Sequence, residues 1–332
     1  MPNNSDYQLN SLLINRFRPG VEDSVKDVDG LMFHYTSPGG LLSILENNEV
    51  FFTDIRFLND KSEDIYLVKL ILDILDKNRN KYPYVSEVVY ELFKNHQISD
   101  LRDLKIINID YYTPLKFIPR RKFVFCTTTD ADLLNMWNYY VHDGRYQGYN
   151  IGFNVEKLLK SLDSEKPKTI DPFSVVYGKV LYDSKKQKEE ILHLFSRMEN
   201  NIKTASDKSK EIDFYVMDLR SYIDSYGAFY KNPSFSQEKE FRFCIEIDDE
   251  RLKQEKPHYS STINTRMRCG YRVANGLIVP YIAVKFNKDA VSTIHMSPMT
   301  EFQIAKESIR EVLTDYHYER VQVWKSTIPI RF

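Results

Sequence analysis

The chain has 332 residues, of which 42% are hydrophobic and 28% are charged, a composition typical of soluble globular proteins. Its formal net charge of -1 argues against a nucleic-acid binder that is basic over its whole surface, although a local basic groove is compatible with that total. The N-terminal stretch lacks the apolar core of a signal peptide, and no run approaches the roughly 18 apolar residues of a membrane span. We therefore expect a cytoplasmic protein without a membrane partner.

The cysteines and glycines exclude several kinds of site. Cys126, Cys244 and Cys269 are widely spaced and form no CxxC pair, so the sequence predicts neither a zinc site nor a disulfide framework and favours a reducing compartment. Glycine is scarce, at 11 residues, and no P-loop or GxGxxG motif is present. The histidines are far apart in the sequence, and we expect no metal site.

The ordered part of the chain begins with a predicted β-α-β unit. Residues 1–30 are polar and form a lead-in that ends in "DVDG". An apolar strand over 31–35 is followed by a helix start at Ser37-Pro38, by leucines with helical spacing, and by a second strand, "EVFFTD".

The next segments alternate between helices and strands. "FLNDKSEDIYLVKLILDIL" predicts a polar loop and then a helix, which Asp60 or Ser62 can cap, and residues 80–115 are mixed helix and loop. "RRKFVFCTTTD" predicts a strand, "LLNMWNYY" a short helix and "QGYNIGFN" another strand.

The second half adds two amphipathic helices and then mainly strands. Apolar residues recur at helical spacing between 185 and 230, with the charged "SDKSKE" between the two helices. Strands are predicted at "EKEFRFCIEI", "NGLIVPYIAVKF", "VSTIHMSP" and "RVQVWKSTIPI", with a helix over about 301–314. We expect one mixed α/β (α+β) domain over 31–332, with helical insertions near 62–115 and 185–230.

The strand "QEKEFRFCIEI" carries the most informative polar pattern. Alternation puts Glu238, Glu240 and Arg242 on one face and Phe241 and Phe243 on the other, which must belong to the core. One interpretation is a solvent-facing strand with a weak Glu-Arg pair. The other is a functional pair, in which like charge raises one carboxylate pKa while Arg242 keeps the other group ionised, as a general base requires.

The stretch "HYTS" contains a second candidate group. Strand alternation puts His34 and Thr36 on one face and Tyr35 on the other, so His34 and Thr36 are the predicted pocket pair and Tyr35 the packing residue. A histidine in a strand is also commonly a hydrogen-bonded structural residue, and that alternative stays open.

Aromatic and amide side chains suggest a platform for a flat ring. Trp137, Tyr139 and Tyr140 lie beside glycines and are suited to stacking against a nicotinamide or nucleobase, although they equally suit a helix anchored on a sheet. Capping explains Asp60 in "RFLNDKSE" but leaves Asn59 without a structural account, so Asn59 is a candidate binding residue.

Three arginines surround a glycine in "RMRCGYR". Arg266, Arg268 and Arg272 are candidates for contact with phosphate, because the guanidinium fork matches phosphate oxygens. The alternative is that they are scattered surface residues.

Several motifs together resemble a known family. "FHYTSPGGLLSILENNEVFFTDIRFLNDKSE", "FVFCTTTDADLLNMWNYY", "GYNIGF", "KNPSFSQEKEFRF" and "VWKSTIPIRF" are similar in order and content to a bacterial family of unknown function associated with abortive phage infection. The resemblance covers nearly all of the chain from about residue 31. Phe235 departs from it where a tryptophan is expected, and "TTTD" replaces a more serine-rich stretch.

That family in turn resembles the ADP-ribosyltransferases with a His-Tyr-Glu signature, which implies a central split β-sheet with flanking helices. By this resemblance His34, with Thr36 beside it, holds the adenosine-side ribose of NAD, and Tyr140 or Tyr139 stacks on nicotinamide. Glu240, or in second place Glu238, engages the nicotinamide ribose. Arg242 positions the carboxylate or meets a diphosphate.

The resemblance implies an NAD-dependent ADP-ribosyltransferase-like enzyme or NAD glycohydrolase, serving in anti-phage defence or as a toxin. Its partners would be NAD as substrate, a protein or nucleic-acid acceptor, and a phage-derived trigger. A non-catalytic sensor that binds a phage protein or nucleotide is the main alternative. A nuclease would require a metal cluster or a basic groove, and neither is evident in the sequence.

Overall fold

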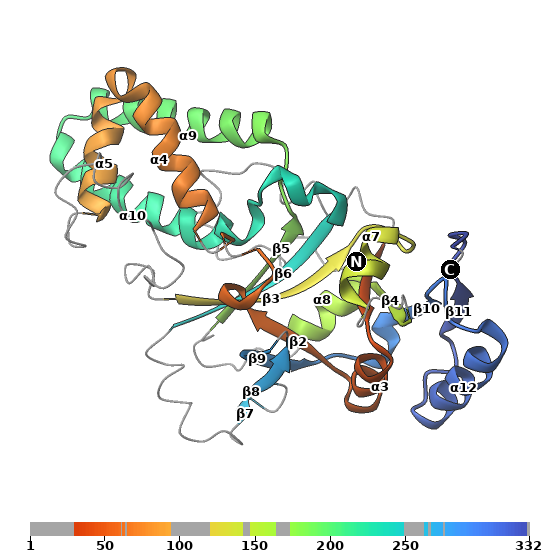
Figure 1. Ribbon diagram of the computed structural model, residues 1–332. Coiled ribbons are helices and arrows are strands. Elements are labelled where there is room, and N and C mark those ends of the chain that lie inside the picture. Colours follow the sequence, from red (N-terminus) through yellow and green to blue (C-terminus); the bar gives the residue numbers. More distant parts are fainter. Residues whose placement is uncertain are drawn as a thin grey trace.

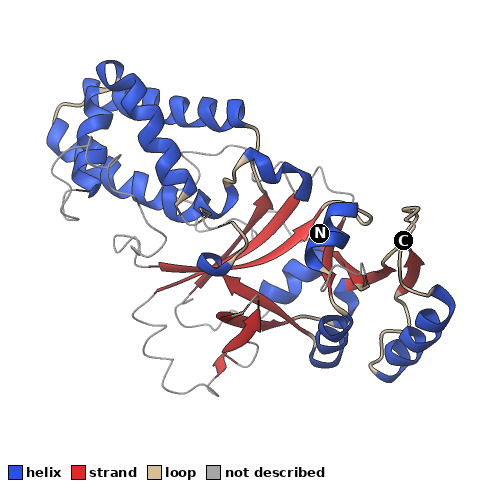
Figure 2. Cartoon of the chain, in the orientation of Figure 1, coloured by secondary structure: helices blue, strands red, loops and turns tan. Residues whose placement is uncertain are grey.

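The computed structural model describes residues 30–60, 62–63, 65–93, 120–141, 147–163, 173–248, 262–264, 267–274 and 276–330. Nearly all of the predicted lead-in over 1–30, and residues 94–115 of the segment predicted as mixed helix and loop, lie outside these residues. Within them the chain forms an eleven-stranded mixed sheet with helices on its faces and a group of helices at one end (Figures 1 and 2). The mixed α/β class predicted from the sequence is confirmed.

The strands, in chain order, are β1 (Leu31–Thr36), β2 (Glu49–Asp54), β3 (Arg120–Thr128), β4 (Tyr149–Asn154), β5 (Phe173–Lys179), β6 (Glu240–Asp248), β7 (Thr262–Asn264), β8 (Met267–Ala274), β9 (Leu277–Lys285), β10 (Val291–Met296) and β11 (Gln322–Lys325). The α-helices are α3 (Pro38–Asn47), α4 (Tyr66–Asn78), α5 (Pro83–Phe93), α7 (Leu134–Tyr140), α8 (Val155–Asp163), α9 (Ser184–Thr204), α10 (Lys208–Tyr226) and α12 (Phe302–Asp315). Short 3-10 helices are η2 (Ile55–Phe57), η3 (Arg79–Lys81), η6 (Gly227–Phe229), η7 (Pro233–Glu238) and η8 (Lys288–Ala290).

The sheet forks at β3. On one edge, β3 pairs with β6 over its whole length, and β5 pairs with the far edge of β6. On the other edge, β3 pairs with β2 at Phe123 and Val124, but with β1 only at Thr128. Strands β1 and β2 therefore diverge beside residues 125–127 of β3, and each continues into its own half of the sheet. Apart from the branch formed by β6 and β5, the order is β11-β10-β4-β1-β3-β2-β9-β8-β7.

Alternation along β6 separates an apolar face from a polar one. Phe241, Phe243 and Ile245 are all fully buried in the main core, which confirms the predicted apolar face. Glu240 and Arg242 point to the other face, and they are buried too. The interpretation of a solvent-facing strand is therefore wrong, because helices and loops cover both faces of β6.

Local sequence signals fix the helix ends. Ser37 caps α3 by accepting from the Gly40 amide, and Asp183 and Asp207 cap α9 and α10. The predicted cap of α4 differs, because Asp60 accepts instead from the amide and hydroxyl of Ser62 in the preceding turn, and α4 begins at Tyr66.

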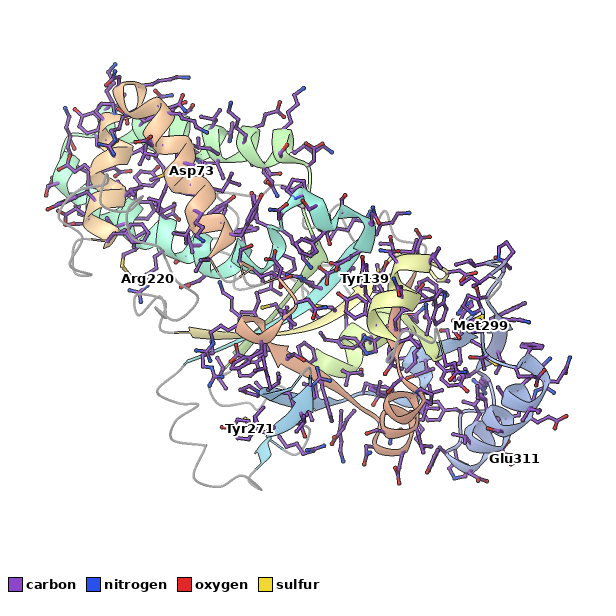
Figure 3. The ribbon with its side chains drawn as sticks, in the orientation of Figure 1. Asp73, Tyr139, Arg220, Tyr271, Met299 and Glu311 are labelled. Atoms are coloured by element: carbon purple, nitrogen blue, oxygen red, sulfur yellow. The ribbon has the colours of Figure 1, made fainter. Side chains whose placement is uncertain are left out.

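The four helices α4, α5, α9 and α10 share one apolar core at one end of the sheet (Figure 1). We call these helices the helical unit. Labelled residues Asp73 on α4 and Arg220 on α10 mark it in Figure 3. The chain enters the unit at α4 after η2, leaves it after α5 to form β3, α7, β4, α8 and β5, re-enters it at α9 and leaves it again from α10 through η6 toward β6. The residues before α4 and after η6 contact the polar face of β6.

Candidate functional site

Five charged side chains gather where β6 begins, and all are buried. We call this group the charge cluster: it contains Glu63, Lys231, Glu238, Glu240 and Arg242, with exposed fractions of 1%, 2%, 6%, 3% and 0%. Glu63 precedes α4 and Lys231 follows η6, so the junctions of the helical unit supply two of the five groups. Buried charges are costly unless they are paired and hydrogen-bonded, which makes their arrangement informative.

Two cations hold the cluster together. The Arg242 Nη2 atom lies 2.6 Å from Glu240 Oε2 and 2.9 Å from Glu63 Oε1, while Nη1 donates to the Ala228 carbonyl at 2.8 Å. The Lys231 Nζ atom lies 2.8 Å from Glu63, 2.6 Å from Glu238 and 3.0 Å from Glu240. Each cation therefore bridges carboxylates from different segments of the chain.

Two half-buried tyrosines bind the carboxylates from outside. The Tyr140 hydroxyl, at the end of α7, donates to Glu238 Oε1 at 3.0 Å. The Tyr182 hydroxyl, which follows β5, donates to Glu240 Oε2 at 3.2 Å. The cluster thus reaches the surface through two phenol groups.

The two carboxylates of the motif differ in their electrostatic surroundings. Burial alone would raise the pKa of Glu240, but the charges of Arg242 and Lys231 outweigh it and hold that pKa at about 2. Burial and the neighbouring charge of Glu240 raise the pKa of Glu238, although Lys231 opposes the shift. The pair is therefore divided into a permanently ionised group and one that retains a proton to higher pH.

Within the described part of the chain, the cluster contains two polar atoms without hydrogen-bond partners. These are Glu63 Oε2 and Arg242 Nε, both fully buried. Because buried polar atoms are normally paired, they mark a place for a water molecule or a ligand atom.

Glu238 does not belong to the strand, as the alternation assumed. It ends η7, and Lys239 adopts a left-handed conformation with φ 46° before β6 starts at Glu240. This turn brings the Glu238 carboxylate back beside Lys231, so the predicted proximity of the two glutamates holds for a different geometrical reason.

His34 lies in the fork of the sheet, one strand away from the cluster. Its ring packs against Phe125 with centroids 4.7 Å apart, on the face opposite Glu240 and Arg242. Its Nδ1 atom donates to the Cys126 carbonyl at 2.9 Å, which leaves Nε2 as an acceptor. Cys126 in turn pairs with Arg242 across β3 and β6, so the structure links His34 to the cluster through β3 without bringing both onto one face.

The surroundings of His34 keep it neutral. Burial lowers its pKa to about 4; the hydrogen bond to Cys126 opposes this shift, and the charge of Arg272 adds to it. His34 and Cys126 are nevertheless only half-buried, although β1 and β3 lie in the middle of the sheet. The fork is therefore open to solvent at this point.

The other predicted site residues have separate places. Thr36 lies against α3, where a Cβ atom on Gly40 would come within 2.1 Å of its hydroxyl. Trp137 is fully buried, packs edge-on against Tyr35 and donates to Asp132 at 2.7 Å, so it anchors α7. Tyr139 is 68% exposed, and Asn59 is exposed as well. Tyr35 is a packing residue, as predicted.

Sequence reasoning missed three members of the site. These are Lys231, Tyr182 and Glu63. Lys231 lies in "KNPSFSQEKEFRF" and Glu63 in "FLNDKSE", so both belong to motifs that carry the resemblance. What the sequence did not reveal is that these segments meet, because Glu63 and Arg242 are separated by 179 positions.

The profile of a protein family of unknown function, DUF2971, matches residues 136–243. This range is less than half of the chain and runs from α7 into β6. It contains Tyr140, Lys231 and both glutamates of the motif, whereas Glu63 and His34 precede it. Neither the curated proteins nor the solved structures contain a match to the chain. None of the helices in the described ranges has the length and apolar character needed to cross a membrane.

Proposed function

We propose that the protein is an NAD-consuming enzyme of the ADP-ribosyltransferase or NAD glycohydrolase type, acting in anti-phage defence or as a toxin. The observation that carries the proposal is the divided pair of carboxylates, Glu238 and Glu240: Lys231 contacts both of them, and Tyr140 donates to Glu238. Two carboxylates with different protonation behaviour are the usual equipment for cleaving a bond at an anomeric carbon.

The chemistry assigns a different role to each carboxylate. When the bond between the ribose C1′ and the nicotinamide nitrogen breaks, its electron pair leaves with nicotinamide and positive charge develops on the ribose. Ionised Glu240, with its pKa held at about 2, stabilises that charge. The attacking hydroxyl or water then loses a proton, and the carboxylate of Glu238 accepts it, because its raised pKa makes it the stronger base.

Tyrosine and histidine complete the proposed site. Tyr140 donates to Glu238, and in the proposed complex it is the member of the aromatic stretch that contacts nicotinamide. His34 presents Nε2 as an acceptor, which suits a ribose hydroxyl. Since His34 packs on the face of the sheet opposite Glu240, the substrate would reach it only through the fork between β1 and β2.

The test is release of nicotinamide from NAD by the purified full-length protein, with and without protein, nucleic-acid and water acceptors. Glu240→Gln should abolish release, whereas Glu189→Gln, a change at a side chain that is 62% exposed, should leave it intact. If the protein neither binds nor consumes NAD, and Glu240→Gln leaves cellular toxicity unchanged, the proposal fails.

A non-catalytic sensor is the second candidate, and one observation favours it. The charges of the cluster are almost completely buried and paired with each other, as in a rigid structural core. This candidate predicts nucleotide or phage-protein binding without turnover and tolerance of Glu240→Gln in the binding assay.

A further inference from the structure

Two arginines on the same face of β8 have opposite surroundings. Arg268 is neutralised: its Nε and Nη2 atoms lie 3.1 Å and 2.7 Å from Glu49 Oε2, and Nη1 donates to Tyr281 at 3.1 Å. Arg272 donates from Nη2 to the Thr53 hydroxyl at 2.9 Å, and no carboxylate among the described residues forms an ion pair with it. Arg272 therefore presents an uncompensated positive charge.

This charge lies at the fork. Thr53 is 5% exposed and belongs to β2, where it pairs with Val124 of β3 just before the two strands part. The charge of Arg272 acts on His34, which lines the fork from β1. Since Thr53 accepts the bond from Arg272, its own hydroxyl proton remains available to a ligand.

The fork and the charge cluster thus differ in the sign of their net charge: the fork is positive and the cluster is negative. In the cluster three carboxylates face two cations, whereas Arg272 stands alone. Thr53 and Glu240 are two strands apart and offset along them by four residues, because Thr53 pairs with Val124 and Val124 with Cys244. Strand spacing and rise give a separation of about 16 Å between these positions. A ligand that binds at both places must carry a negative group for the fork and a positive group for the charge cluster, and the two groups must be well separated.

We propose that Arg272 and Thr53 form a subsite for the phosphate groups of a dinucleotide whose positively charged ring lies at the charge cluster. The inference rests on the proposed function and specifies its substrate as the oxidised, cationic form of the dinucleotide. The guanidinium group of Arg272 offers two parallel N–H donors to phosphate oxygens, and the Thr53 hydroxyl adds a third donor. The reduced dinucleotide, whose ring is neutral, gains nothing from the acidic end and binds more weakly.

The experiment measures binding of ADP-ribose, inorganic pyrophosphate and adenosine to the full-length protein by calorimetry at two salt concentrations. Arg272→Gln should weaken ADP-ribose and pyrophosphate binding by about tenfold or more and reduce the salt dependence, while adenosine binding stays unchanged. Arg272→Lys keeps the positive charge but not the planar guanidinium with its parallel donors, and should give an intermediate loss of affinity. Arg268→Gln is the matched control and should change affinity by less than about twofold, since its charge is already neutralised.

Equal affinity of wild type and Arg272→Gln for ADP-ribose would overturn the subsite, and so would an equal loss of adenosine binding. Failure of the wild type to bind either phosphate ligand would overturn it as well. The readout is binding, so it is independent of turnover: Arg272-dependent ADP-ribose binding in a protein that does not consume NAD refutes the proposed reaction and retains the subsite. Circular dichroism of each variant verifies the fold.

Discussion

Replacing Lys231 with methionine removes the ammonium group that lies between Glu63, Glu238 and Glu240. The methionine side chain is of similar length and fills most of the same space, so the main effect is the loss of charge. Three buried carboxylates then face Arg242 alone. The contact of the Lys231 ammonium with the Phe235 ring, 4.9 Å from its centroid, is lost as well.

The magnitude follows from the burial of the group. Removing one partner of a buried ion pair costs about 3–5 kcal/mol, because the remaining charge is left uncompensated. The pKa of Glu240 gives a second estimate of this energy. A pKa lowered from 4.5 to about 2 corresponds to roughly 3 kcal/mol of stability from the cationic neighbours of Glu240. A folded protein has only about 5–15 kcal/mol in total, so the loss is large.

The pH dependence has a definite sign. The stability that Glu240 contributes is present above its unfolded pKa and is lost as the pH falls toward 2, because its folded pKa is lowered. Glu238 behaves oppositely: its folded pKa is raised, so the protein loses stability as the pH rises through that value. Without Lys231 both carboxylates bind protons more readily, and the destabilisation should be larger at pH 8 than at pH 5.

Urea denaturation followed by circular dichroism at both pH values measures the effect. Lys185→Met is the control, since that side chain is 85% exposed and 3.9 Å from Glu189, and it should change stability by less than about 0.5 kcal/mol. A loss for Lys231→Met below about 1 kcal/mol, or one that is the same at pH 5 and pH 8, would refute the electrostatic account of the cluster.

Three further predictions concern the scaffold around the site. Trp137→Ala should destabilise the protein by about 3–5 kcal/mol in thermal unfolding, because a fully buried ring is removed, whereas Leu134→Ala, at 49% exposure, should have little effect. Gly148→Ala should lower the melting temperature, because the added Cβ would lie 2.3 Å from Val141 and 2.7 Å from a backbone oxygen. Asp54→Asn should lose about 1–3 kcal/mol in urea at pH 7 and less at low pH, because Arg56 and Arg121 hold the pKa of Asp54 below its usual range against burial.

Strong periodicity made most of the fold predictable from the sequence. The β-α-β opening, the helices of the helical unit and the strand that contains Arg242 all correspond to elements of the structure. The predictions did not include β5, β7, β8 and α8. Helix α8 directly follows β4 without a glycine or proline between them, so its start had no clear boundary signal.

The site was only partly predictable, because alternation is a local rule. It placed Glu240 and Arg242 on one face correctly and required Phe241 on the other. It could not place Lys231, which lies in the loop after the helical unit, or distinguish a solvent-facing pair from a buried one. Burial of the polar face of β6 depends on the segments before α4 and after η6, which are far apart in the sequence, and the periodicity of a single segment cannot predict that they meet.

The dependence of the charge cluster on the helical unit has a consequence for how the site is controlled. Glu63 and Lys231 lie at two of its junctions: Lys231 contacts Glu240 directly, and Glu63 contacts both cations that keep Glu240 ionised. A displacement of the helical unit from the sheet would separate Lys231 from the carboxylates and raise the pKa of Glu240, which would weaken its ability to stabilise positive charge. A partner that bound α4, α5, α9 or α10 and displaced them from the sheet would therefore change the protonation state of the site through two residues, rather than through a long path in the core.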